Sequence, residues 1–122
     1  MAVVELTKEN FEATVTGNDF VIVDYWAPWC GPCRSFAPTY EKVSEEFPNV
    51  VFAKVNTEDE QEIAGQFGIR SIPTLMIFRD QVIIYSEAGA LPEASFRELV
   101  TKASELDMDE VRKQIAEGQQ EG

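Results

Sequence analysis

Apolar residues fall along this chain in two alternating patterns, which predict strands and helices in turn. Nearly continuous apolar runs rich in β-branched and aromatic residues predict buried strands, and apolar residues three or four positions apart predict amphipathic helices. FVIVDYWA is the clearest strand, and the clearest helix follows it, with Phe36, Tyr40, Val43 and Phe47 on one side. Strands are expected at 3–6, 20–27, 49–56, 74–78 and 82–88, and helices at 7–14, 33–47, 58–68 and 92–103.

The order of these elements defines the fold class. Alternation of strands and helices predicts a parallel sheet, and the tight connection Arg79-Asp80-Gln81 adds an antiparallel hairpin at one side. The chain is therefore expected to be α/β, with a central mixed five-stranded sheet flanked by about four helices.

A tail follows the last of these helices, so we divide the chain into a domain at 1–104 and a helical extension at 105–122. Asp107 and Glu110 form a capping pattern, Leu106 and Val111 fit a hydrophobic staple, and Gly118 is expected to end the helix. Two interpretations remain open: a short helix that lies on the domain or frays in solvent, and a docking helix for a partner.

Composition excludes several functions. The 122 residues suit one domain, and the net charge of −12 disfavours binding to nucleic acid. No apolar run approaches the roughly 18 residues of a membrane span. The start of the sequence lacks the pattern of a secretory signal, so a cytoplasmic protein is expected.

The most informative segment is WAPWCGPCR, which contains both cysteines of the chain. A bridge this short would constrain the unfolded chain little, which makes a stabilising staple a poor explanation. A structural zinc site needs four ligands, and the chain offers two cysteines and no histidine, so a metal would require a site shared between chains. Thiol–disulfide exchange is the interpretation that we favour.

The surroundings of the two cysteines support redox chemistry. Cys30 follows a buried strand and opens a helix, where unpaired N–H groups and the helix dipole favour a thiolate that can attack a disulfide. Cys33 lies on the same side of the helix, close enough to form a disulfide with Cys30 and to resolve a mixed disulfide. Gly31 gives the turn its freedom, and Pro32 suits the start of a helix.

Asp24 interrupts an otherwise apolar strand six residues before Cys30. A buried carboxyl would have a raised pKa and could accept a proton from Cys33, although an exposed strand edge would also explain Asp24. Lys54, on the next predicted strand, is either its charge partner or an ordinary surface lysine. Trp29 beside Cys30 is expected to be partly exposed and to offer a client an apolar surface.

The stretches VDYWAPWCGPC, FGIRSIPTLMIF and EAGAL resemble the active-site segment, the cis-proline segment and the turn before the last helix of the thioredoxin family. The resemblance covers roughly residues 3–103 and implies the thioredoxin fold. It also implies the roles of attacking thiol for Cys30, resolving thiol for Cys33, proton acceptor for Asp24 and supporting lysine for Lys54.

The resemblance further implies a substrate-binding surface. Pro73 matches the cis-proline, the Ile72 backbone would pair with a client strand, and Gly89 would keep the groove open. Two departures stand out: Gln81 replaces a usual glycine in the hairpin, which predicts a strained turn, and Ser71 replaces a glycine beside the cis-proline loop. Neither touches the redox chemistry.

The function expected is that of a general protein dithiol–disulfide oxidoreductase that reduces client disulfides through a reversible Cys30–Cys33 bond. We expect a monomer without a cofactor or metal that a separate thioredoxin reductase recycles, because the chain has no nucleotide-binding motif. Two alternatives remain. One is an oxidase or isomerase in an exporting compartment, and the other is an interaction module that binds partners around Trp29, Ile72 and Gly89.

Overall fold

Five strands form one mixed sheet in the order β1-β3-β2-β4-β5 in the computed structural model, which describes residues 3–121. β2 pairs in parallel with β3 and antiparallel with β4, β1 joins β3 in parallel, and β5 joins β4 in an antiparallel hairpin. The sheet confirms the mixed topology predicted from the alternation of elements. The strands are β1 (Val3–Glu5), β2 (Phe20–Trp26), β3 (Val51–Asn56), β4 (Thr74–Arg79) and β5 (Val82–Ala88).

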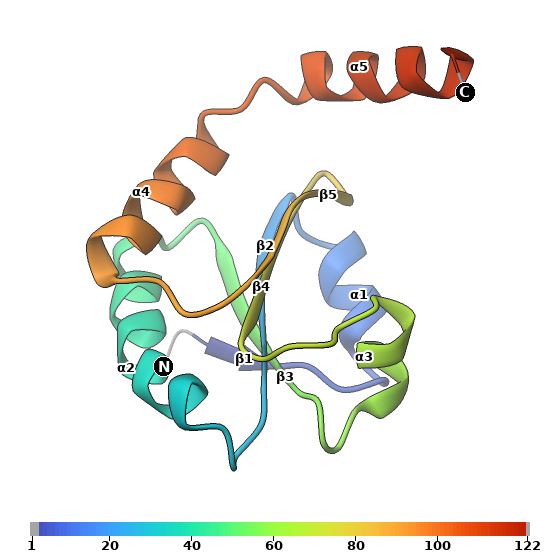
Figure 1. The fold of residues 1–122 in the computed structure, drawn as a ribbon. Coiled ribbons are helices and arrows are strands. Elements are labelled where there is room, and N and C mark those ends of the chain that lie inside the picture. The colour runs from blue at the N-terminus through green and yellow to red at the C-terminus, as the bar shows by residue number, and fades with distance from the viewer. Residues whose placement is uncertain (1–2, 122) are drawn as a thin grey trace.

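Four helices cover the two faces of this sheet, and a fifth follows them (Figure 1). One core packs α2 and α4 against Ile22 of β2, and the other packs α1 and α3 against Val21 and Val23. Alternate residues of β2 therefore face opposite cores, which explains why the strand is apolar almost throughout. The helices are α1 (Phe11–Thr16), α2 (Gly31–Glu46), α3 (Gln61–Gln66), α4 (Glu93–Ser104) and α5 (Met108–Glu121).

The helix expected at 7–14 begins later than predicted. The Thr7 carbonyl accepts the N–H groups of Asn10 and Phe11, and the Asn10 side chain accepts the Thr7 N–H at 2.7 Å. These bonds close a turn over residues 7–10, so α1 begins only at Phe11. Polar side chains that bond to nearby backbone compete with helix formation in this way.

The C-terminal helix α5 is attached to the domain. Asp107 caps it as predicted, because its Oδ1 accepts the N–H groups of Asp109 and Glu110. Met108 is buried, and Arg112 pairs with Asp80 of the β4–β5 turn at 2.8 Å. The prediction that Gly118 ends the helix was wrong, since α5 continues to Glu121. Figure 1 shows α5 near the β4–β5 end of the sheet, opposite the loop that links β2 with α2.

The hairpin turn carries the strain that the sequence predicted. Asp80 and Gln81 have φ angles of 51° and 69°, although neither is glycine. A left-handed backbone of this kind costs an ordinary residue roughly 1–2 kcal/mol, because its Cβ approaches the carbonyl oxygen. Gln81 recovers little of this cost, since its side chain makes one long hydrogen bond, of 3.5 Å, to the Thr16 carbonyl.

Replacing Gln81 with glycine should therefore increase the free energy of unfolding by about 0.5–1 kcal/mol, after the greater freedom of glycine in the unfolded chain is subtracted. Urea denaturation measures the difference. Gln81→Ala is the control, because it removes the same side chain and keeps the strain. Equal stability of the glycine and alanine variants would contradict the prediction.

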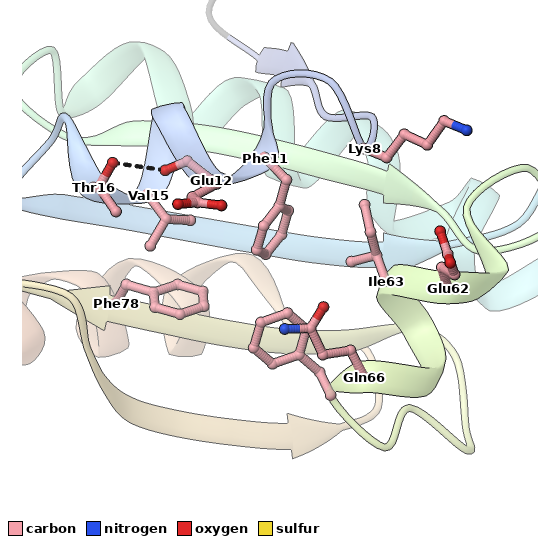
Figure 2. A pocket seen from close by; sticks show the side chains of 10 residues that line it. Lys8, Phe11, Glu12, Val15, Thr16, Glu62, Ile63, Gln66 and Phe78 are labelled. Carbon is pink, nitrogen blue, oxygen red and sulfur yellow. Dashed lines mark hydrogen bonds between the residues drawn. The ribbon is translucent and has the colours of Figure 1, made fainter.

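A hollow lies away from the cysteines, between α1 and α3 (Figure 2). It has a volume of about 630 Å³, and its apolar part is formed by Phe11, Val15, Ile63, Phe67 and Phe78. None of the residues that the sequence analysis assigned to the redox site lines it.

Candidate active site

Cys30 and Cys33 form a disulfide where β2 passes into α2. Cys30 is the residue before the first turn of α2, with an extended backbone, and Cys33 lies within that turn. Their Cα atoms are 5.2 Å apart, within the range that a disulfide accommodates. Gly31 and Pro32 separate them and are exposed, as expected for residues at the start of a surface helix.

The helix start is directed at the sulfur of Cys30. The Cys33 N–H donates to Cys30 Sγ at 3.2 Å. Pro32 contributes no N–H, so this donor is one of few available in the first turn. In the reduced protein the same N–H and the positive end of the helix dipole would favour a negative charge on this sulfur.

A small apolar cluster surrounds the disulfide. Ala27 and the half-buried Trp26 and Ile72 pack against the two cysteines, which are 5% and 2% exposed. The peptide bond between Ile72 and Pro73 is cis, and the Ile72 carbonyl oxygen lies 3.8 Å from Cys30 Sγ. The cis-proline that the resemblance implied thus lies beside the disulfide.

An exposed apolar rim borders this cluster. Trp29 is 66% exposed, more than any other large hydrophobic residue that the structure describes as exposed. Gly89 has a φ of +108°, a conformation that side chains rarely adopt, and its N–H donates to the Pro73 carbonyl at 2.7 Å. This bond brings the end of β5 next to the cis-proline, so Gly89 adjoins the same surface.

Asp24 is buried in the centre of the sheet, on the side covered by α2. It is 4% exposed, and its Oδ1 has no hydrogen-bond partner among the side chains described for residues 3–118 or the backbone of residues 3–121. Burial raises the pKa of Asp24 from 3.8 to about 7, although the positive charge of Lys54 acts in the opposite direction. The carboxyl can therefore hold or release a proton near neutral pH.

Lys54 is paired with Asp24 in the register of β2 and β3. Its ammonium group lies 5.1 Å from the centre of the Trp26 ring. Lys54 and Asp24 border a cavity of about 490 Å³. Its other side is formed by Ala37, Pro38, Tyr40 and Glu41 of α2, with Val3 of β1. Ala37 is four residues after Cys33, so the helix that carries the second cysteine also covers the carboxyl.

Two residues of this region were not singled out by sequence analysis. The Arg34 guanidinium donates to the Pro28 carbonyl at 2.8 Å and so holds the loop that presents Trp29. The Tyr40 hydroxyl contacts the backbone of both β2 and β3. The only sequence signal for Tyr40 was a tyrosine at a buried position of the helix. No sequence signal distinguished Arg34 from an ordinary surface arginine.

Comparison with known proteins identifies the family. The thioredoxin family model matches residues 2–102. The chain belongs to the thioredoxin family. "Putative thioredoxin 2" of Streptomyces coelicolor is 59% identical over 116 residues, which are 95% of this chain and 87% of that protein. The thioredoxin of Bacillus subtilis is 38% identical over 103 residues, which are 84% and 98% of the two chains.

Solved structures of the thioredoxin family share the fold. A mutant thioredoxin of Halobacterium salinarum superposes with a TM-score of 0.79 at 27% identity, over 86% of this chain and 93% of that one. Plasmodium falciparum thioredoxin gives a TM-score of 0.76 at 31% identity, over 81% and 97%. The α/β prediction with a thioredoxin fold is confirmed.

Membership of the thioredoxin family and the Cys30–Cys33 pair establish the activity. The chain is a protein dithiol–disulfide oxidoreductase with protein-disulfide reductase activity, and its clients are proteins that contain disulfides. No group of cysteine, aspartate and glutamate side chains among residues 3–118 could hold a metal ion. No helix that the structure describes is long and apolar enough to cross a membrane.

Proposed function

We propose that this thioredoxin-family protein works as a reductant in the cytoplasm, with the division of labour between residues described below. The observation that carries the proposal is the position of Cys30 Sγ, which accepts an N–H at the N-terminus of α2. A thiolate favoured by the helix start attacks, and reduction of clients suits a compartment that keeps thiols reduced.

The reaction begins at Cys30. Its thiolate attacks one sulfur of a client disulfide, forms a mixed disulfide and releases the other client sulfur as a thiolate, which takes up a proton. Trp29, Gly31, Pro32, Ile72, Pro73 and Gly89 would form the client surface. The exposure of Trp29 and the junction of Gly89 with Pro73 support this assignment.

Cys33 completes the reaction with the help of Asp24. The Cys33 thiol transfers its proton to the Asp24 carboxylate and attacks Cys30 Sγ, which releases the second client thiolate and closes the Cys30–Cys33 disulfide. Burial and the pKa near 7 suit Asp24 to this proton transfer, and Lys54 supports the carboxylate through its charge. Two electrons have then passed to the client.

A separate thioredoxin reductase would return two electrons and two protons to the disulfide.

We also propose that residues 1–104 form the redox domain and that 105–122 are an extension. The family match ends at residue 102, and α5 contacts the β4–β5 turn rather than the cysteines, which supports this division. The oligomeric state expected is a monomer.

A reductase-coupled assay with a disulfide-containing client protein tests the proposal. We expect catalytic release of client thiols and a reduction potential well below that of the glutathione couple. A potential near or above that couple would favour the oxidase or isomerase alternative, and binding of partners without any turnover would favour the interaction module. The same assay on a chain that ends at Ser104 should show unchanged turnover if the division into domains is correct.

A further inference from the structure

Tyr40 is a buried tyrosine of α2 whose hydroxyl contacts two strands. The oxygen is 3.0 Å from the Ile22 carbonyl oxygen of β2 and 2.7 Å from the Ala53 carbonyl oxygen of β3. A hydroxyl has one proton to donate, so the two carbonyls share a single donor. The side chain is only 2% exposed, which makes these protein contacts its main polar interactions.

These contacts lie next to the proposed proton acceptor. Asp24 is opposite Lys54 in the register of β2 and β3, and the Tyr40 hydroxyl contacts β2 two residues before Asp24 and β3 one residue before Lys54. Tyr40 also lines the cavity that Asp24 and Lys54 border. The hydroxyl thus joins a helix side chain to the two strands that carry the buried Asp24 and the half-buried Lys54.

The same helix carries the resolving thiol. Cys33 precedes Tyr40 by seven residues, which is about two helical turns and places both on one side of α2. The Tyr40 hydroxyl therefore links the helix of Cys33 to the strand of Asp24. A proton transfer between the two residues depends on the distance between them.

We propose that Tyr40 is a positioning residue for proton transfer from Cys33 to Asp24: its hydroxyl holds α2 against β2 and β3, and this contact limits the access of water to the carboxyl. The proton moves from the sulfur to the carboxylate, and Tyr40 neither gains nor loses one. This inference rests on the role proposed for Asp24.

The charged surroundings of Asp24 agree with a neutral Tyr40. Lys54 faces the cavity from β3, Glu41 and Tyr40 face it from α2, the thiol of Cys33 belongs to the same helix, and the remaining residues that line the cavity are uncharged. Burial and the negative charge of Asp24 both raise the pKa of Tyr40. The phenol therefore remains protonated and keeps its donor throughout the neutral range.

Tyr40→Phe separates the hydroxyl from the ring. The Ile22 and Ala53 carbonyls would lose their shared donor, and water from the adjoining cavity would replace it and hydrate Asp24. Hydration lowers the pKa of a buried carboxyl, so the midpoint of Asp24 titration should fall by about one pH unit. The pH profile of disulfide reduction should move in the same direction by a similar amount.

Tyr25→Phe is the matched control. Tyr25 is buried like Tyr40, but it belongs to β2 and faces the core under α1 and α3. Its hydroxyl makes only a 3.6 Å contact with the sulfur of Met76. Its loss should leave the Asp24 midpoint and the pH profile unchanged. Equal shifts in the two variants, or no shift in Tyr40→Phe, would overturn the positioning role.

A measurement on the unmodified protein tests the same coupling without a substitution. The chemical shifts of the Tyr40 ring in NMR spectra should change with pH, with the same midpoint as the titration of Asp24. Chemical shifts that stay constant through that transition would overturn the inference. Asp24→Asn distinguishes the two proposals. If the pH profile of Asp24→Asn is the same as that of the unmodified protein, the role of Asp24 is rejected. If the profile of Asp24→Asn changes and that of Tyr40→Phe does not, only the role of Tyr40 is rejected.

Discussion

Replacing Cys33 with serine should stop turnover and leave client proteins covalently attached to Cys30. The first attack needs only the thiolate at the helix start, so mixed disulfides still form. The second attack needs the thiol of Cys33, and a serine hydroxyl is too weak a nucleophile to replace it at neutral pH. We expect a loss of at least about 1,000-fold in multiple-turnover reduction, because without resolution each molecule reacts once.

Non-reducing electrophoresis followed by mass spectrometry measures the adducts directly. Cys30→Ser is the control, since it removes the attacking thiol and should yield neither turnover nor adducts. The roles assigned to the two cysteines would be reversed if the Cys30→Ser variant formed adducts on Cys33 as fast as the Cys33→Ser variant forms them on Cys30.

Asp24→Asn should produce a more stable and slower enzyme. In the native oxidised protein the carboxyl keeps its proton up to a pH of about 7, whereas an ordinary aspartate loses it near 3.8. The native state therefore binds more protons than the unfolded state between these values, and stability decreases as the pH rises through this window. At pH 8 the cost of the buried charge is on the order of 4 kcal/mol, at about 1.36 kcal/mol per pH unit.

Asparagine removes this dependence because it has no charge to bury. Denaturant unfolding should show a variant that gains stability over the unmodified protein as the pH rises from 4 to 8, with little difference at pH 4. Disulfide reduction should slow most at neutral pH, where the carboxylate is the proton acceptor, and less at alkaline pH, where thiols ionise without help. A constant difference in stability between pH 4 and 8 would show that Asp24 is not protonated in the native protein.

Part of this site could be predicted from the sequence because each signal was local. The apolar run of β2 indicated a strand buried on both faces, and the single break in that run indicated Asp24. The four residues from Cys30 to Cys33 indicated a redox pair at a helix start. Their roles in the reaction remain predictions that the substitutions above test.

Other features depend on contacts between distant segments, which a linear pattern does not contain. The periodicity that predicted α2 placed Tyr40 on the apolar side of the helix, and nothing in it showed that the hydroxyl would reach carbonyls on two strands. The isomer of the bond before Pro73 entered only through the family resemblance, since few such bonds are cis. The late start of α1 came from bonds within the turn at Thr7 that compete with the helix.

The absence of histidine from the chain gives the buried carboxyl an experimental use. Histidine is the side chain whose ordinary transition falls between pH 5 and 8, and in most proteins its transitions overlap there. Both cysteines of the oxidised protein are held in the disulfide and do not titrate. Potentiometry of the intact, unlabelled protein can therefore follow Asp24 through its transition without imidazole background, with the terminal α-amino group as the ordinary group to be subtracted.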